Sequence, residues 1–162
     1  MTETTNRAEG LRAWAAGMYT LAAAAELLIH YGSPLLNGPW VEYDPDRERY
    51  WFNTVTVAEE AGYLSGGERR VLDIAASLAS DERPIALGDA VSGLDRKPLE
   101  LVLAAIAHAA GSHEHSAAVT KEGADGVPRM VRIDRLGSLY PWPDDGVARS
   151  AATATRDEGT TS

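Results

Sequence analysis

The chain has 162 residues, no cysteine and a formal net charge of −9 at pH 7. This length fits one domain with a hydrophobic core and leaves little room for a second. Without cysteine the chain has no disulfides, thiolate metal ligands or thiol nucleophiles. The negative charge disfavours non-specific binding to nucleic acid, because the phosphates would repel the protein. The apolar run at residues 21–29 contains Glu26 and is too short for a bilayer, so we expect a cytoplasmic protein with no membrane segment.

Residues 8–31 are predicted to form one helix, preceded by a flexible N-terminus of residues 1–7. Apolar side chains recur at steps of three and four and form a single stripe, made of Leu11, Trp14, Met18, Leu21, Ala25 and Leu28. Gly17 lies inside this pattern and is unfavourable in a helix, so it predicts a close approach to another helix. The Gly32–Pro34 segment ends the helix.

Residues 40–53 have the pattern of a β-hairpin, with two aromatic and β-branched runs around a turn that contains Pro and Asp. Pairing Tyr43 with Tyr50 places Val41 opposite Phe52 on the same face. We expect this face to point into the core.

The other face of the hairpin then carries Trp40 and Trp51. Two tryptophans exposed together are typical of an interaction surface. Tryptophan is also usually buried to a large extent, which leaves the alternative that residues 139–142 pack over both rings.

Two helices after the hairpin are predicted to begin at a capping box, in which a Ser or Thr and a Glu three residues later bond each other's backbone N–H groups. The first is a short helix between residues 54 and 63, with its box at Thr56–Glu59. The second spans residues 66–80, with its box at Ser65–Glu68, and has an inward stripe of Val71, Ile74, Ala75 and Leu78.

A third long helix is predicted over residues 95–110, capped by Asp95. Apolar side chains surround it almost completely, which indicates burial on two sides or contact with a partner. Leu101 and His108 lie away from its main stripe and are therefore candidates for contact with a partner.

After residue 112 the pattern weakens. Residues 117–120 and 130–136 are consistent with two strands around the Gly-rich turn at 122–126. The whole is predicted to be an α+β fold, mainly helical, with three principal helices and a small antiparallel β element. The globular domain is expected to span residues 8–142, followed by a disordered tail at 143–162 that is poor in large apolar residues.

The segment 64–68, LSGGE, resembles the signature motif of ABC-type ATPases, and 92–95, SGLD, resembles the D-loop of that family. The resemblance implies a nucleotide at the helix start. However, the chain contains no Gly-Lys pair for a phosphate loop, and Gly88 stands where the family has a metal-binding Asp. Asp89 stands where the family has its catalytic Glu. The chain therefore shares the helix start with that family but lacks the residues that would bind phosphate and metal.

The chain also resembles small proteins of high-GC, actinobacterial-type genomes over roughly residues 11–111. The matching parts are His30–Gly32, Trp40 with Trp51, Ser65–Ala79, Ala90–Asp95 and Val102–Gly111. This resemblance implies no activity, and it suggests that the ABC-like segment is a shared way of beginning a helix.

No catalytic constellation is found. His113 and His115 are two residues apart, past a helix end, and a metal pair on a helix needs a spacing of three or four. We therefore expect no metal and no cofactor. DNA binding through a helix-turn-helix in 66–110 is disfavoured, because the helix at 95–110 offers few polar side chains to a groove.

The sequence favours a non-enzymatic protein-interaction or regulatory protein that binds another protein or itself. It is expected to bind no nucleic acid and no membrane. Its expected interaction residues are Trp40, Trp51, Leu101 and His108. The alternative is a nucleotide- or anion-binding module at the helix start formed by Ser65, Gly66 and Gly67, whose backbone N–H groups favour negative charge.

Overall fold

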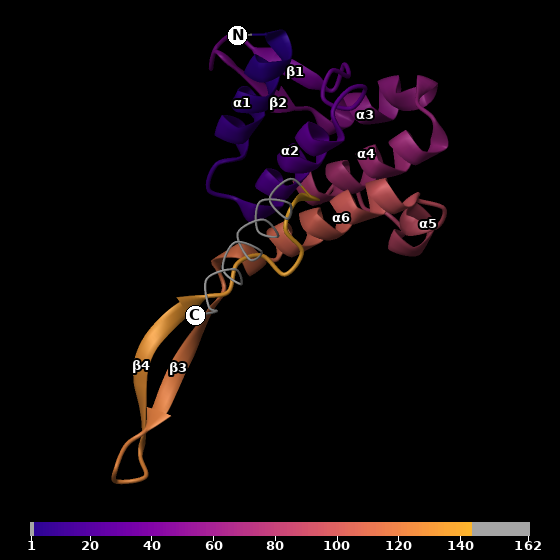
Figure 1. The fold of residues 1–162 in the computed structure, drawn as a ribbon. Helices are drawn as coiled ribbons and strands as arrows, with labels where there is room; N and C mark the ends of the chain where they lie inside the picture. Colours follow the sequence, from indigo (N-terminus) through magenta and orange to yellow (C-terminus); the bar gives the residue numbers. More distant parts are fainter. Residues whose placement is uncertain (1, 144–162) are drawn as a thin grey trace, which may run out of the picture.

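The structure is a computed structural model that describes residues 2–143 and has an α+β, mainly helical fold (Figure 1). Its α-helices are α1 (Glu3–Ala15), α2 (Tyr19–Tyr31), α3 (Thr54–Glu60), α4 (Gly66–Ala79), α5 (Leu87–Val91) and α6 (Arg96–Ala109). Two 3₁₀ turns follow α3 and α6, η1 (Ala61–Tyr63) and η2 (Ser112–Glu114). The strands are β1 (Val41–Asp44), β2 (Arg49–Phe52), β3 (Ser116–Glu122) and β4 (Pro128–Arg135). Apart from Pro143, the tail predicted at 143–162 lies outside the described residues.

Helix α2 lies at the centre of the core and packs against α1, α4 and α6. Its Ala23–Ala25 run, together with Leu27 and Leu28, is fully buried. Because alanine side chains are short, the neighbouring helices approach α2 closely, and the Ala104–Ala105 pair of α6 is buried in the same core. Within residues 2–143, no helix has the length and apolar character that a membrane crossing requires.

The single helix predicted at 8–31 is in fact two helices, α1 and α2. The break falls at Gly17, whose φ of +90° is a left-handed conformation that glycine adopts without steric cost. A Cβ at Gly17 would meet no atom within 4 Å, so the expected close helix approach is also wrong. Residues 3–7, expected to be flexible, form the beginning of α1, and Thr2 caps it by accepting from the Thr5 N–H at 3.2 Å.

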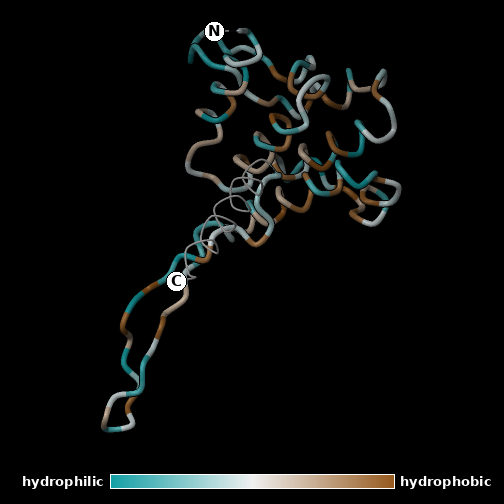
Figure 2. The backbone as a smooth tube through the Cα atoms, viewed as in Figure 1, coloured by the Kyte–Doolittle hydropathy of each residue, from teal (hydrophilic) through white to brown (hydrophobic). Residues whose placement is uncertain are grey.

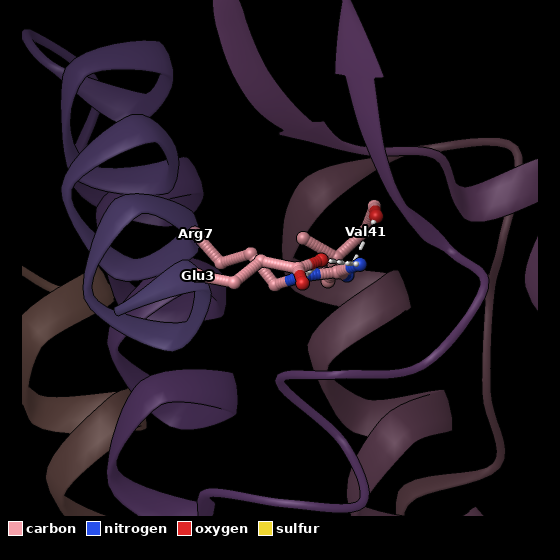
Figure 3. Close-up of polar contacts among 3 residues, drawn as sticks. All are labelled: Glu3, Arg7 and Val41. Carbon is pink, nitrogen blue, oxygen red and sulfur yellow. Dashed lines mark hydrogen bonds and ion pairs between the residues drawn. The ribbon is translucent and has the colours of Figure 1, made fainter. Parts of the chain in front are cut away.

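Helix α1 packs across the β1–β2 hairpin. Arg7 donates to the carbonyl of Val41 at 3.1 Å and pairs with Glu3 at 3.1 Å, which fixes the start of α1 on the edge of β1 (Figure 3). A Cβ on Gly10 would lie 2.8 Å from the backbone N of Tyr50, so only glycine allows the helix to approach the strand this closely.

The predicted hairpin register is confirmed, with Val41 opposite Phe52 and Tyr43 opposite Tyr50. Val41 and Phe52 are buried as expected, but Tyr43 is 53% exposed. On this face, Tyr50 packs partly against α1, whereas its partner Tyr43 on β1 is not covered by the core.

The short helix α3 exists, but its predicted box at Thr56 is wrong. Asn53 caps the helix by accepting from the Val55 N–H at 3.1 Å, and Thr56 instead donates to Glu42 at 2.6 Å. The box at Ser65 is confirmed. The Ser65 N–H donates to Glu68 at 2.9 Å, and the Glu68 N–H donates to the Ser65 hydroxyl at 3.3 Å.

Strands β3 and β4 form a second hairpin, which does not join β1 and β2. We call this hairpin, residues 116–135, the arm, and residues 3–115 the body. The arm projects from the body as a two-stranded ribbon (Figure 1). The single globular domain predicted at 8–142 is therefore a helical body with a protruding arm.

Candidate interaction surface

Helix α6 has one buried and one exposed apolar face. Leu101, Val102, Ala104 and Ala105 face the core. Leu99, Leu103 and Ile106 recur at steps of four and three, and all three are exposed. Apolar side chains lie on both faces of this helix, but the expectation that Leu101 is exposed for contact with a partner is wrong. Leu101 is only 4% exposed, since it lies on the core side.

The exposed face of α6 borders a groove of about 490 Å³. Its other wall is the segment that leaves β4, with Leu136, Leu139 and Tyr140. Leu139 is 76% exposed, although its neighbours are apolar. Several large apolar side chains are seldom exposed together on a protein surface unless they form a binding site, so the groove is a candidate binding site.

The arm itself has two different faces. Paired residues lie on the same face of a hairpin, and the register pairs Ala118 with Ile133 and Thr120 with Met130. Ile133 is 64% and Met130 62% exposed. The opposite face carries Lys121 paired with Arg129, and Val119 paired with Arg132. Hydrophobic and hydrophilic residues alternate along the arm (Figure 2).

A short set of hydrogen bonds holds the base of the arm to the body. The Leu136 N–H donates to the carbonyl of His115 at 3.0 Å, and the Leu139 N–H donates to the hydroxyl of Ser112 at 3.2 Å. Ser112 is buried and its hydroxyl also lies 3.2 Å from that of Ser138. The groove wall is thus tied directly to η2.

Aromatic rings form a continuous stack beneath this base. Trp142 lies parallel to His30 of α2, with ring centres 4.6 Å apart, and it is buried. His108 of α6 stacks on His113 of η2 at 4.1 Å, and Tyr19 meets His113 edge-on at 5.0 Å. The stack joins α2, α6, η2 and the segment after the arm. We call these five rings the joint.

A half-buried carboxylate lies beside the joint. Glu26 accepts from Arg12 of α1 at 2.6 Å and pairs with His30 at 3.3 Å. Burial raises the pKa of Glu26, but the hydrogen bonds from His30 and Arg12 outweigh that effect and lower it to about 2. The same hydrogen bond raises the pKa of Arg12. Glu26 is therefore ionised in the fold and links α1 to α2.

His108, the second candidate on α6, belongs to the joint. Burial lowers the pKa of His108 and the neighbouring His113 lowers it further, while Glu26 acts in the opposite direction. The lowered pKa favours the neutral form of the His108 ring. Nδ1 of His113 is buried and makes no hydrogen bond. Among residues 2–143, no cluster of three or more His, Asp or Glu side chains has the proximity to hold a metal ion.

The two hairpin tryptophans have different environments. Trp40 is fully buried, because it precedes β1 and turns inward, where its indole N–H donates to the carbonyl of Leu35 at 2.8 Å. Its ring lies directly on Gly38, where any side chain would collide with it. The expectation that Trp40 faces outward is therefore wrong, because its ring lies in the core.

Trp51 is half-buried and lines an open hollow of about 560 Å³ with Trp14 and the β1–β2 turn. The alternative that residues 139–142 cover both tryptophans is also wrong, because Trp142 stacks on His30 in the joint. Tyr63 lies over Trp40 instead, with ring centres 6.2 Å apart.

The helix start at Ser65–Gly67 is occupied by the chain's own side chains. The carboxylate of Glu68 takes the Ser65 N–H, so a phosphate would compete with a negative charge in the same turn. Gly88 and Asp89, which correspond to the metal and catalytic positions of ABC ATPases, lie in helix α5 rather than at the end of a strand. The segment Ile85–Leu87 therefore does not form the strand of that family.

The joint and the groove were not found from the sequence. In the sequence, His30 belongs to one of the resemblances and Glu26 interrupts an apolar run, and neither observation predicts the joint. The detectable signal was that Glu26 and His30 are four apart on an otherwise apolar helix, where a polar pair needs partners. The partners Arg12 and Trp142 come from distant parts of the chain.

Comparison with known proteins finds no matching family model, no similar curated protein and no similar solved structure. The two resemblances described from the sequence stay predictions, and the functional argument rests on the geometry of the chain itself.

Proposed function

We propose that this protein acts by binding another protein molecule through the arm and the groove at its base, as an interaction or regulatory protein without chemistry of its own. The observation that carries the proposal is the exposed apolar stripe of Leu99, Leu103 and Ile106, which continues into Leu136 and Leu139. Such contiguous apolar surface mainly occurs where a partner covers it.

The shape of the arm supports the same proposal. A two-stranded hairpin is at best marginally stable in water, because it has no core of its own. Both outer edges of the arm present unpaired backbone groups, which are ready to pair with or dock on another chain. A partner that covers the apolar face would supply the missing core.

A photo-crosslinker placed at Leu139 tests the proposal in cells that express the chain from its own gene. We expect one adduct of defined mass, because Leu139 lies in the groove. The matched control is the same crosslinker at Val55, which is also strongly exposed but lies on α3. Absence of an adduct at Leu139, or the same adducts at both positions, would contradict the proposal.

A further inference from the structure

We infer that the partner is a second copy of this chain, and that two molecules exchange arms, each laying the apolar face of its arm along α6 and the groove of the other. This inference rests on the proposed function and names its partner. It follows from the length, the position, the charge and the area of the surfaces involved.

The arm and α6 have matching lengths. Strand β3 has 7 residues, which corresponds to about 23 Å at the rise of an extended strand. Helix α6 has 14 residues, which corresponds to about 21 Å. The exposed stripe from Leu99 to Ile106 spans about 11 Å of this helix, so the arm is long enough to cover the stripe and to continue over the groove beyond Ile106.

The chain cannot fill its own groove with its own arm. The groove lies at the base of the arm, where α6 meets residues 136–140. The arm points away from the body (Figure 1). Residues 144–162 contain Val147 as their only large apolar side chain, so their composition does not suit an apolar groove either. A second molecule supplies an apolar arm of the right size.

The arm and the body have net charges of opposite sign. Residues 116–135 carry four basic and three acidic side chains, a net charge of +1. Residues 1–115 carry 17 acidic and nine basic side chains, a net charge of −8. Two bodies repel each other, whereas the arm, with its small positive net charge, is not repelled by the body of another copy, which disfavours direct contact between bodies.

The contact is large enough for a dimer because symmetry repeats it. An arm about 25 Å long and about 10 Å wide covers roughly 250 Å² and hides a similar area of the surface beneath it. In a two-fold dimer both arms are covered, so the total is roughly 1,000 Å², at the lower limit for a specific interface. We therefore expect a reversible dimer.

Sedimentation equilibrium of the full chain over a range of concentrations tests the dimer. Ile133→Glu and Leu103→Glu each bury an unpaired charge in the contact, so each is expected to raise the dissociation constant at least about 100-fold. Val55→Glu adds the same charge to an exposed position on α3 and leaves the dimer intact. A wild-type chain that stays monomeric over a 100-fold range of protein concentration reaching about 200 µM would overturn the inference.

Disulfide trapping tests the exchange itself, since the natural chain has no cysteine. Mixing Ile133→Cys protein with Leu103→Cys protein under mild oxidation is expected to give a mixed disulfide dimer, whereas Ile133→Cys with Val55→Cys gives none. Dimers of Ile133→Cys with itself, without the mixed product, would mean arm-to-arm pairing and overturn the exchange. A Leu139 adduct with a different protein would also overturn it, while the proposed function would stand.

Discussion

The body buries apolar side chains from helices far apart in the sequence, whereas the arm buries almost none of its own. Leu27 and Leu28 of α2 are fully covered by three other helices, while Met130 and Ile133 of β4 lie in solvent. Both regions use regular backbone hydrogen bonds. The comparison shows that secondary structure alone does not stabilise a segment, and that the arm depends on what covers it.

The largest expected effect comes from removing a core side chain. Leu27→Ala leaves a cavity in a fully packed site and should lower the free energy of unfolding by about 3 kcal/mol. Ile133→Ala, on the exposed face of the arm, should change it by less than about 0.5 kcal/mol in dilute monomer. Urea unfolding followed by circular dichroism measures both. Equal losses would mean that Ile133 is packed as tightly as Leu27, which contradicts an arm whose apolar side chains lie in solvent.

The second largest effect is expected from acid, which should destabilise the body through Glu26 and leave the arm unaffected. The pKa of Glu26 is lowered to about 2, below the ordinary value of 4.5, so between these values the unfolded chain binds more protons than the folded chain. The stability that Glu26 contributes is therefore complete above pH 4.5 and is lost as the pH falls through about 2. With allowance for residual solvent, we expect about 2 kcal/mol.

Thermal unfolding from pH 6 to pH 2 checks this expectation. Glu26→Gln should be less stable than the wild type near neutral pH and should flatten the acid-dependent loss. Glu122→Gln, which changes an exposed carboxylate of the arm, is the control and should leave the curve unchanged. A wild-type slope in the Glu26→Gln curve would show that another group is responsible.

A smaller loss is expected from the capping box of α4. Ser65→Ala leaves the Glu68 N–H without its acceptor and should cost about 1 kcal/mol. Ser116→Ala, at the exposed start of β3, should cost less than about 0.5 kcal/mol. Chemical unfolding of the two variants compares a cap in the body with a similar change in the arm. Calorimetric titration with ATP and magnesium adds a second readout. Millimolar binding that Ser65→Ala abolishes would favour an anion site.

Sequence patterns within one short segment predicted the elements that are determined by interactions within that segment, such as a helix cap or a hairpin register. The box at Ser65 and the apolar stripe behind it predicted α4 almost to the residue, and the paired tyrosines predicted the register of the first hairpin. The break at Gly17 was missed because the apolar stripe continues across it. A stripe records which side chains face the core and does not record a change in helix direction.

Tertiary relations were the part that could not be predicted. Trp40 lies inside because the chain before β1 turns over Gly38, which no strand pattern records. The arm was recognised as a possible pair of strands, but alternation of apolar and polar residues cannot tell whether a hairpin lies on its own core or projects from it. The joint unites residues from four segments, and apart from His30, which pairs with Glu26 on an otherwise apolar helix, none of them is unusual in its own segment.

The smallest expected effect concerns the joint, where body and arm meet. The pKa of His108 is lowered by burial and by His113, so the unfolded chain takes up a proton at a higher pH than the folded chain does. The contribution of neutral His108 is present above its ordinary pKa of 6.5 and is lost as the pH falls through the lowered value. Because the ring is partly exposed, we expect less than about 1 kcal/mol.

The loss of the stability that neutral His108 contributes should first affect the base of the arm rather than the core. His108 stacks on His113, and Trp142 lies 6.2 Å from His108, so a charge on His108 loosens the contacts that hold the segment after β4. Between pH 7.5 and pH 5, Trp142 fluorescence should change while the helical circular dichroism stays constant. His108→Gln should remove the change, and Trp142→Phe should remove the signal. A fluorescence change that persists in His108→Gln would mean that another group titrates. A charge on His108 would then not loosen the joint.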